Sequence, residues 1–574
     1  MLRLNKETKK KTGRVYLTIQ RGYRDEKGKP RNKHIESIGY VDVLAKEYDD
    51  PIAHFEEVVR KRNEEDARSK TVMIGINTEA RIEDDTPGYR NYGHIIFSKI
   101  YHELEIDRFL DNKRRHENYE FNLEQIARLL IFSRILYPGS KLYTQQHIQG
   151  KYFDNFRFTI DDIYAALDEF NRHSMELQQH LHKKIVEQYG RVTDLLYYDV
   201  TNYYFEIDRE DDLRKRGPSK EKKRDPIVQM GLVVDSQSIP ICYQLYPGNT
   251  NDSETYLPQM AALKKKFHAK RIVVVADKGL NCGDNIAFNL ALGDGYIFSQ
   301  KIRGGSAELK QWVLNKSGYD GKGDSRKKSR IIPVAINVTV RRTGKKKIKK
   351  KVPIDQKQVV FFSQKYADRS KYKRDELLAK AADLINNPSK YDRATHYGAA
   401  DYIKNIKFDK KTGEVIEPEE SLSLNLEKVR EEEKYDGYYL IVTSEFDLSD
   451  DKIIEAYHGL WQIEESFKIT KSTLSTRPIF LRTFEHINAH FLICFIALLI
   501  LRLVEYRINC KYRAARIVES LRQVTCSHVE ENLYIFTYCD EIVRHLETVF
   551  GVDMTKKYQT LGDIRSNLAA AKKI

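Results

Sequence analysis

Hydrophobic and polar positions alternate differently in successive parts of the chain, and each pattern predicts a different kind of element. Residues 13–41 alternate in short runs around a turn near Gly28 and Pro30, which predicts a small β-hairpin. Residues 43–70 are charged and helix-prone, as expected of a connector. From about 93 to 190, apolar residues recur every three or four positions, which predicts a group of helices broken at Pro138.

The order of elements changes at residue 192. Strand-like and helical segments follow one another at 195–201, 227–234, 239–245, 253–267, 271–276, 284–291 and 296–300. The fourth and sixth of these segments have the pattern of helices, and the others have the pattern of strands. This βββαβαβ order predicts an α/β domain of the RNase H-like class, in which helices cover a mixed sheet.

Residues 302–434 depart from this regular order. Their Gly- and Lys-rich turns and strand-like runs, at 334–340 and 359–362, predict an inserted, β-rich subdomain. A strand at 438–443 returns the chain to the core, a helix is expected over 449–471, and the chain is expected to be helical from 485 onward. The predicted domains are a basic hairpin with its connector (1–90), a helical domain (91–190), an RNase H-like domain in two segments (191–301 and 435–505), the insertion (302–434) and a C-terminal helical region (506–574).

Charge narrows the class of partner. The 574 residues are 41% hydrophobic and 32% charged, which is typical of a globular chain of several domains. A net charge of +15 favours a polyanion, either nucleic acid or an anionic membrane. Residues 321–351 hold thirteen Lys or Arg and one acid, Asp324, and so supply +12 of this excess. Five cations of that stretch are candidates for contact with a phosphate backbone: Arg341, Arg342, Lys345, Lys346 and Lys347.

The membrane alternative finds little support. The longest apolar run covers residues 491–501, which is too short to cross a bilayer and predicts a buried helix. The N-terminus has no apolar core of a signal peptide. Six cysteines without a C-x-x-C spacing indicate a reducing compartment and neither a disulfide framework nor a zinc site. We therefore expect a cytoplasmic protein that associates with the nucleoid, with double-stranded DNA as its partner.

Three acidic residues are candidate metal ligands. Asp199 interrupts an apolar strand, and Asp277 follows a strand at the end where open α/β sheets bind ligands. In the helix predicted over 449–471, Glu464 falls on the apolar stripe, whereas Glu465 points about 100° away. A carboxylate in such a stripe is costly unless a cation or hydrogen bonds compensate. Taken singly, each residue is more typical of a satisfied polar group or a turn acid than of a metal ligand, but together they occupy elements of one topology. Mg²⁺ suits such ligands, and Mn²⁺ can replace it.

Four segments resemble a bacterial insertion-sequence DDE transposase over about 120–505. They are Tyr198-Asp199-Val200-Thr201, the run from Pro247 to Ser253, Ala276-Asp277-Lys278-Gly279 and the run from Tyr457 to Lys471. The closest group carries a Tyr-x2-Arg-x3-Glu-x6-Lys signature. The chain matches it with Tyr457, Glu464 and Lys471 but has Leu460 in place of the arginine. This departure puts a phosphate-holding role at position 460 in doubt.

The resemblance implies an RNase H-like core, a β-rich insertion and two magnesium ions. Asp199 would bridge both ions, with Asp277 and Glu464 each serving mainly one. Water would cut at the inverted-repeat ends of the element, and the freed 3′-OH would join to target DNA. Trp461 is a candidate to trap a flipped base, although core packing suits its helical position better, and Tyr457 and Lys471 are further DNA-contact candidates. Two ends must meet, so the resemblance also implies a homodimer in a synaptic complex.

Two rival functions remain at this stage. One is another RNase H-like nuclease, such as a junction resolvase, against which the insertion and the signature argue. The other is a non-catalytic DNA-binding protein derived from a transposase, against which the intact Asp199, Asp277 and Glu464 argue. Recognition of the DNA ends is expected within residues 14–41 and 93–190.

Overall fold

The computed structural model divides into two compact units. The first contains residues 1–181, 469–476 and 480–574, and the second contains residues 182–468 and 477–479. The structure describes residues 2–9, 12–24, 29–69, 79, 81, 88–115, 120–154, 156–217, 225–321, 323, 326–343, 346–386, 397–404, 407–408, 415–416 and 422–573. The division into five domains stays a prediction.

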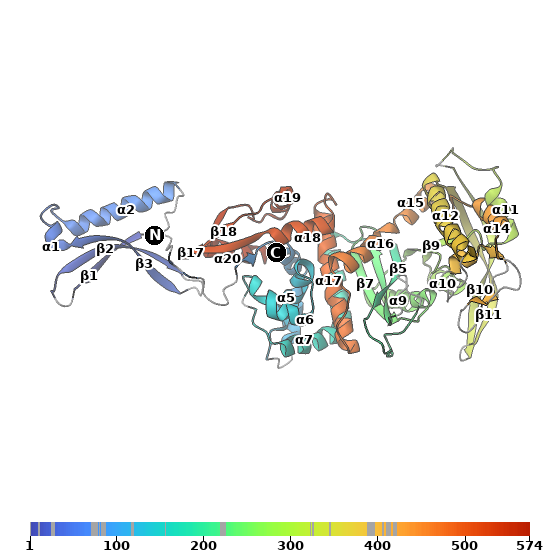
Figure 1. Cartoon of the computed structure of the whole chain (residues 1–574), viewed down its shortest axis with the longest axis horizontal. Helices are drawn as coiled ribbons and strands as arrows, with labels where there is room; N and C mark the ends of the chain where they lie inside the picture. The colour runs from blue at the N-terminus through green and yellow to red at the C-terminus, as the bar shows by residue number, and fades with distance from the viewer. Residues whose placement is uncertain are drawn as a thin grey trace. The chain divides into compact units, whose positions relative to one another are not determined.

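The first unit begins with a three-stranded antiparallel sheet, β1 (Leu2–Thr8), β2 (Val15–Arg24) and β3 (Pro30–Tyr40). β2 and β3 form the predicted hairpin, and β1 adds a strand that the sequence pattern did not reveal. The short helix α1 (Val41–Leu44) and the long helix α2 (Pro51–Ser69) follow. Figure 1 shows α2 lying along one face of the sheet.

The helices of the first unit pack around α17 (Phe484–Arg507), which contacts α3, α5 and α7. They are α3 (Ile95–Glu103), α4 (Ile106–Arg114), α5 (Leu123–Leu136), α6 (Lys141–Tyr143), α7 (Ile160–Arg172), α18 (Ala514–Gln523), α19 (Glu541–Phe550) and α20 (Leu561–Ala571), with a π-helix η1 (Thr144–Ile148) and a 3-10 turn η2 (Gln149–Lys151). Helix α8 (Ser174–Tyr189) begins in the first unit and ends in the second, because the boundary follows Leu181. Side-chain caps fix several starts, for example Asn122 at α5 and the Thr159–Asp162 capping box at α7.

Helix α17 has the length of a membrane span, unlike the eleven-residue run on which the sequence argument relied. Its most apolar window has a mean hydropathy of 2.3, and 94% of that window is buried inside the protein. Burial by α3, α5 and α7, rather than shortness, therefore accounts for its apolar surface.

The C-terminal region is not wholly helical, contrary to the sequence prediction. β17 (Thr525–Glu530), β18 (Leu533–Phe536) and β19 (Tyr558–Thr560) form a sheet with β4 (Arg90–Asn91), in the order β19-β18-β17-β4. These strands are three to six residues long and are buried unevenly, so a two-residue period is too short to recognise in the sequence.

The second unit is built on an eight-stranded mixed sheet in the order β10-β11-β16-β9-β8-β5-β6-β7. Its core is β5 (Leu195–Tyr204), β6 (Ile227–Asp235), β7 (Pro240–Pro247), α9 (Asp252–Phe267), β8 (Val273–Ala276), α10 (Gly283–Ala291) and β9 (Gly295–Gln300). β6 runs antiparallel to both β5 and β7, whereas β5, β8 and β9 run parallel. The predicted RNase H-like order is confirmed, and every predicted segment of 195–300 has its expected type.

The segment after β9 extends this same sheet. The 17-residue strands β10 (Lys327–Thr343) and β11 (Lys346–Phe362) form a long hairpin, and β11 pairs with β16 (Tyr438–Thr443), which pairs with β9. The other elements are α11 (Ala307–Leu314), α12 (Gln364–Asn386), α13 (Tyr397–Ala400), α14 (Leu426–Glu433) and the two-residue strands β12 (Ile403–Lys404), β13 (Lys407–Phe408), β14 (Val415–Ile416) and β15 (Ser423–Leu424). Long strands and long helices therefore share the inserted segment.

The single helix predicted over 449–471 consists of three pieces. They are α15 (Asp450–His458), α16 (Trp461–Lys468) and the π-helix η6 (Ile469–Thr473). α15 ends at Gly459, and a turn through Leu460 separates it from α16. A helical phase counted from Ile453 to Lys471 therefore does not hold, because each break changes the direction of the side chains that follow.

Candidate active site

Asp199 and Asp277 lie at the same level on two neighbouring parallel strands. β5 and β8 pair in register with Tyr197 opposite Val275, and each aspartate comes two residues later. Side chains alternate between the faces of a sheet, so a residue two positions on returns to the same face. The register therefore places both carboxylates on one face, half-way along β5 and directly after the last residue of β8.

Ser299 continues this row on the next strand. β8 and β9 pair Ala276 with Phe298, so Ser299 is level with Asp277. Its hydroxyl donates a hydrogen bond of 2.8 Å to Oδ1 of Asp277, and its carbonyl accepts one of 2.9 Å from Nδ2 of Asn281. Ser299 therefore fixes the orientation of the Asp277 carboxylate.

The segment that carries Glu464 packs on the face of the sheet to which Asp199 belongs. Tyr198 points to the opposite face, where its hydroxyl is 2.7 Å from Oγ1 of Thr255 in α9. Tyr197 shares the face of Asp199, and a Cβ added to Gly459 would lie 2.0 Å from the Tyr197 hydroxyl. Only glycine permits this approach of the α15–α16 turn to the sheet.

Asp277 and Glu464 line one cleft of about 620 Å³, together with Ser299, Tyr366, Tyr439, Tyr457, Leu460 and Trp461. Glu464 is exposed there rather than buried in an apolar stripe. Glu465 does not line the cleft and lies 3.8 Å from Nζ of Lys468. Glu464, rather than Glu465, is the glutamate of the cleft, as the sequence predicts. The helical phase behind that prediction is wrong, because the helix breaks at Gly459 and Glu464 is exposed in the cleft instead of buried in an apolar stripe.

Two tyrosines of the cleft lie close enough to its carboxylates for the charges of those carboxylates to affect their pKa values. Burial raises the pKa of Tyr439, and the charges of Asp277 and Glu464 raise it further. Burial likewise raises the pKa of Tyr457, which is hydrogen-bonded to Ser299 and lies in the field of Asp277. The rings of Tyr366 and Tyr439 are 4.3 Å apart between centroids. The phenols of Tyr439 and Tyr457 therefore stay protonated near neutral pH, and together with the ring of Tyr366 they form an aromatic wall beside the two acids.

Cations line the same cleft. Lys278 and Lys301 lie just past the ends of β8 and β9, and Lys365 and Arg369 come from the first turns of α12. A fifth, Arg303, is held by Asp436, whose Oδ1 is 2.9 Å away. The composition of the cleft, acids beside exposed cations and aromatic rings, suits a phosphodiester strand.

The other predicted site residues are distributed as follows. Trp461 is 50% exposed and lines the cleft, whereas Tyr457 is 8% exposed. Lys471 lies on η6 in the first unit, half-buried. Arg341 is exposed near the tip of the β10–β11 hairpin, where Arg342 pairs with Lys347 and Thr343 with Lys346. The side chains of Arg342, Lys346 and Lys347, and the whole of Lys345, lie outside the described residues.

Sequence reasoning missed Ser299, Tyr366, Tyr439, Lys365 and Arg369. Ser299 carried a usable signal, since it ends a strand parallel to the one before Asp277. Lys365 and Arg369 carried none, because α12 is a polar helix in a segment whose place beside the sheet follows only from the pairing of β11 with β16.

The donors suit a hard divalent cation in type, since carboxylate oxygens are its preferred ligands. Asp199 does not line the cleft that Asp277 and Glu464 share. Among the residues that the structure describes, no three His, Cys, Asp or Glu side chains stand close enough together to hold one ion. The strand register relates Asp199 to Asp277, and the packing of Gly459 against Tyr197 relates Asp199 to the segment that carries Glu464.

Comparison with known proteins gives two family matches. Residues 205–500 match the model of the transposase DDE domain, and residues 3–72 match the N-terminal domain of the IS1634 family transposase. No curated protein matches the chain. Among solved structures, the piggyBac transposase synaptic complex with hairpin DNA has a TM-score of 0.35 and 8% identity, covering 87% of this chain and 88% of that one. The Mos1 transposase paired-end complex with the left transposon end has a TM-score of 0.11 and 14% identity, covering 38% and 59%.

Proposed function

The chain belongs to the family of transposases with a DDE domain, and we propose that Asp199, Asp277 and Glu464 are the carboxylates with which this DNA transposase cuts and joins strands. The observation that carries the proposal is the register of β5 and β8, which sets Asp199 level with Asp277 on the face that the Glu464 segment covers.

Divalent cations complete this site in the proposal. Asp199, Asp277 and Glu464 would hold two Mg²⁺ ions, for which Mn²⁺ can substitute. When bound, such a pair lowers the pKa of water and stabilises the leaving 3′ oxygen of a phosphodiester. The carboxylates are acceptor-only groups, so the protein itself needs no Ser-His-Asp or Cys-His arrangement for this reaction.

The remaining residues of the cleft position the DNA strand. Ser299 holds Asp277 in one orientation through its 2.8 Å hydrogen bond. Lys365 and Arg369 face the cleft from α12 and would contact non-bridging phosphate oxygens, a role that Leu460 cannot fill. The rings of Tyr366 and Tyr439 offer faces on which an unpaired nucleotide can stack.

The test is cleavage and strand transfer on linear DNA that carries both sequences flanking the gene, with Mg²⁺. We expect wild type to release and join the ends and Asp199→Asn to do neither. Asp194→Asn is the matched control, because this exposed aspartate lies at the start of the same strand. Equal strand transfer by wild type and Asp199→Asn would exclude the proposed metal site.

The proposal includes a homodimer that holds two DNA ends in one synaptic complex. The resemblance to DDE transposases supports it, since both ends of an element must be brought together to be joined to one target. Light scattering of the chain with a DNA end should give two chains and two duplexes. A mass of one chain with one duplex at every concentration would contradict it.

A further inference from the structure

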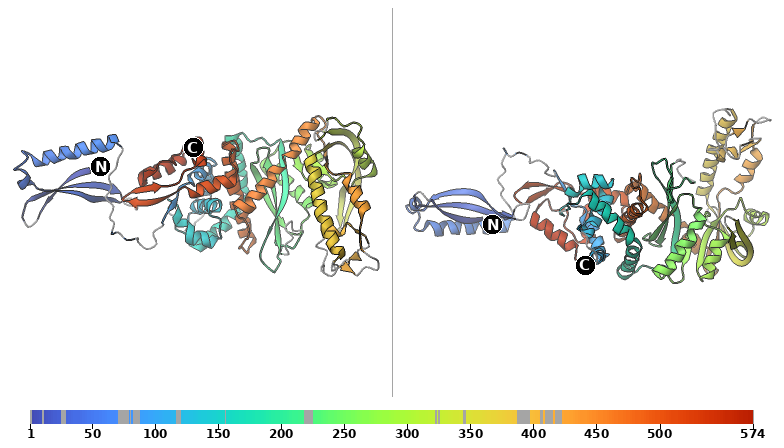
Figure 2. Two further views of the ribbon diagram at one scale, coloured as in Figure 1. Left: turned by 45° about the horizontal axis from the view of Figure 1, so that its top comes forward. Right: turned by 90° about the horizontal axis from the view of Figure 1, so that it is seen from below.

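The N-terminal sheet has one covered face and one open face. Leu2, Ile19 and Val59 form a buried cluster with Leu4 and Ile38, which seats α2 on the sheet. Figure 1 and the left view of Figure 2 show α2 along this one face. Within the described part of residues 2–69, no helix lies on the other face.

Strand register identifies the residues of the open face. Arg3 is opposite Gln20, Asn5 is opposite Thr18, and Gln20 is in turn opposite His34. Alternation sends these side chains away from Leu4 and Ile19. The open face contains Arg3, Asn5, Gln20, Gly22, Asn32, His34 and Ser37 around the buried Thr18, with Glu7 and Tyr16 at one end. It is a surface of hydrogen-bond donors and acceptors rather than an apolar surface for another protein.

Contacts across the strands hold these side chains in place. A Cβ at Gly22 would lie 2.6 Å from Nη2 of Arg3, so the guanidinium lies across the sheet over Gly22. The same Nη2 donates to Oδ1 of Asn32. Nδ2 of Asn5 is 3.3 Å from Oγ1 of Thr18, and Nε2 of His34 is 2.9 Å from Oγ of Ser37. The side chains are therefore oriented before any ligand binds.

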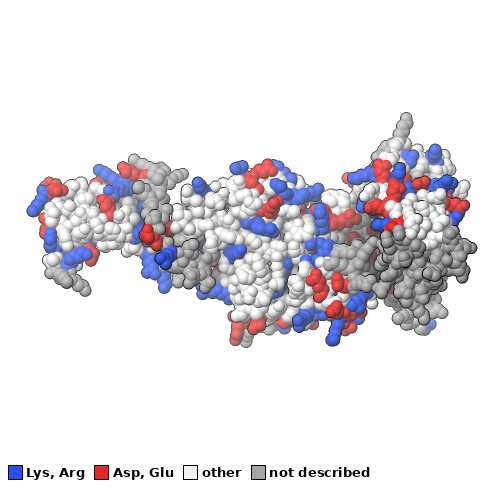
Figure 3. Space-filling view, viewed as in Figure 1, with Lys and Arg blue, Asp and Glu red and all other residues white. Residues whose placement is uncertain are grey.

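The segment that forms the sheet and the helix α2 differ in net charge. Residues 1–41 hold twelve Lys and Arg against four Asp and Glu, a net charge of +8. Residues 51–69 hold four Lys and Arg against five Asp and Glu, a net charge of −1. On α2, Arg60 forms ion pairs with Glu57 and Glu64. Figure 3 shows both signs of charge over α2. The excess belongs to the whole segment, because Lys6 and Arg14 pair with acids of α2 and α1. The open face itself carries Arg3 and Glu7, so a polyanion is attracted to the sheet segment as a whole rather than to the helix.

We propose that the open face of β1, β2 and β3 binds in the major groove of duplex DNA and reads the sequence of the element's ends. The outer strands are about 10 Å apart, within the groove width of about 12 Å. Arg and Asn or Gln side chains are the groups that recognise guanine and adenine edges there. This inference rests on the proposed function, because it assigns end recognition to a surface separate from the catalytic carboxylates.

The first test measures binding by the full-length chain in EDTA, so that cleavage does not enter. Each protein is titrated against a duplex of the element's own end and a shuffled duplex of equal composition. Arg3→Ala should lower the ratio of the two affinities by about tenfold or more, as should Gln20→Ala, whereas the exposed Arg60→Ala should stay within about twofold of wild type. Circular dichroism establishes that each variant is folded.

The second test alters the DNA instead of the protein. Replacing purines of the end by 7-deazapurines removes N7 acceptors from the major groove only. It should weaken wild type and have little further effect on Arg3→Ala. Unchanged end preference in both Arg3→Ala and Gln20→Ala, no effect of 7-deazapurines, or a change in oligomeric state instead of DNA affinity would overturn the inference.

Failure of this inference and failure of the proposed function are distinguishable. Asp199→Asn should bind the end as wild type does in EDTA and yet not cleave it. Cleavage by Asp199→Asn would overturn the metal site but leave the result for Arg3 intact. Loss of end preference in Asp199→Asn, with Arg3→Ala unaffected, would instead place recognition in the second unit.

Discussion

Single residues decide the chemistry of the cleft, and Ser299 is the one that the sequence did not reveal. Its hydroxyl donates to a charged carboxylate, a kind of hydrogen bond worth about 1.5–3 kcal/mol. We predict that Ser299→Ala slows single-turnover cleavage by about tenfold or more, with unchanged DNA affinity. Ser444→Ala is the control, since Ser444 directly follows β16 of the same sheet but lies outside the cleft. An equal decrease of the cleavage rate in both variants would mean that the substitutions disturb the sheet in general, and not the orientation of Asp277 in particular.

Arg369 tests the cationic side of the cleft. It faces the cleft from α12, whereas Arg303 of the same cleft is held by Asp436. We predict that Arg369→Ala reduces the cleavage rate by about tenfold. It should also reduce the slope of log DNA affinity against log salt by about 0.9, the amount expected for one phosphate contact. Arg303→Ala should leave the salt slope unchanged, and the opposite pattern would contradict this assignment.

At the residue scale, the three candidate carboxylates can be predicted from the sequence, whereas the residues that surround them in the cleft cannot. Asp199 and Asp277 are recognisable because an acid beside buried strands is unusual, and both lie where the pattern predicts. Glu464 was chosen by a helical phase that the break at Gly459 invalidates. Tyr366 and Tyr439 could not be found, because tyrosine is as common in a core as beside a substrate.

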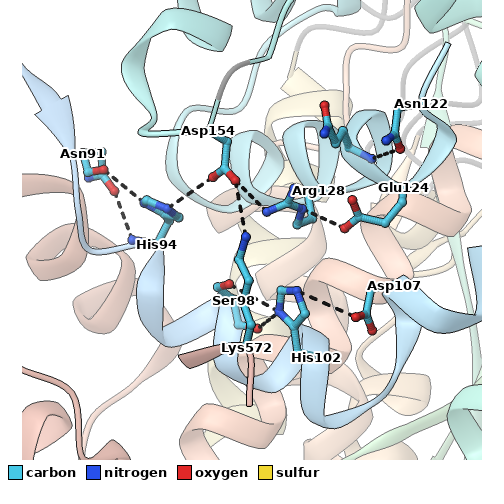
Figure 4. Close-up of polar contacts among 11 residues, drawn as sticks. Asn91, His94, Ser98, His102, Asp107, Asn122, Glu124, Arg128, Asp154 and Lys572 are labelled. Atoms are coloured by element: carbon cyan, nitrogen blue, oxygen red, sulfur yellow. Dashed lines mark hydrogen bonds and ion pairs between the residues drawn. The ribbon is translucent and has the colours of Figure 1, made fainter. Parts of the chain in front are cut away.

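Among the elements, buried ion pairs connect α5 to its neighbours in the first unit (Figure 4). Arg128 lies 2.7 Å from Oε1 of Glu124 and 2.7 Å from Oδ1 of Asp154. Asp154 also lies 3.7 Å from Nζ of Lys572 at the end of α20. We predict that Arg128→Ala costs about 3–5 kcal/mol of unfolding free energy, because it leaves Glu124 buried without its cation and Asp154 with only the more distant Lys572. Exposed Arg108→Ala should cost under about 1 kcal/mol in the same urea titration.

His94 in this network makes stability depend on pH. Burial lowers its pKa to about 4, although Asp154 opposes this shift. Arg128 and Lys572 already compensate the charge of Asp154, so the buried imidazole stays neutral in the folded chain. Below the ordinary value of 6.5 the unfolded chain binds a proton that the folded chain does not.

Stability should therefore be complete above pH 6.5 and fall as the pH decreases toward 4. The loss from one such histidine is about 1.4 kcal/mol per pH unit. Urea unfolding at pH 7 and pH 5 should show a smaller difference for His94→Gln than for wild type. An equal difference in both proteins would remove His94 as the cause.

The elements of the second unit were more predictable than those of the first. Strands of four to ten buried residues between helices leave a long, regular pattern, and all seven segments of 195–300 were found. β17, β18 and β19 were missed because they are short and one of them pairs with the distant β4. The pairing of β11 with β16 is likewise a contact over about eighty residues, which no local pattern encodes.

For the whole molecule, the net charge of +15 makes DNA binding a matter of counterion release. Lys349, Lys350 and Lys351 are exposed on β11 and extend from the sheet that holds the cleft. We predict that replacing all three by Ala reduces the slope of log affinity against log salt by about 2.7. Replacing the exposed lysines of residues 265, 266 and 270, near the end of α9, should change the slope by less than about one. Equal slopes for both triple variants would mean that β11 contributes no specific phosphate contacts.

The central claim is that Asp199, Asp277 and Glu464 act together, and neighbouring glutamates allow its most direct test. The measurement is the single-turnover rate of end cleavage in Mg²⁺ for wild type, Asp277→Asn, Glu464→Gln and Glu465→Gln. Loss of one metal ligand should remove several kcal/mol of transition-state stabilisation, so Asp277→Asn and Glu464→Gln should be slower by about a thousandfold. Glu465→Gln should stay within about threefold of wild type, because Glu465 lies outside the cleft. Near-wild-type cleavage by Glu464→Gln, or an equally large loss in Glu465→Gln, would contradict the account.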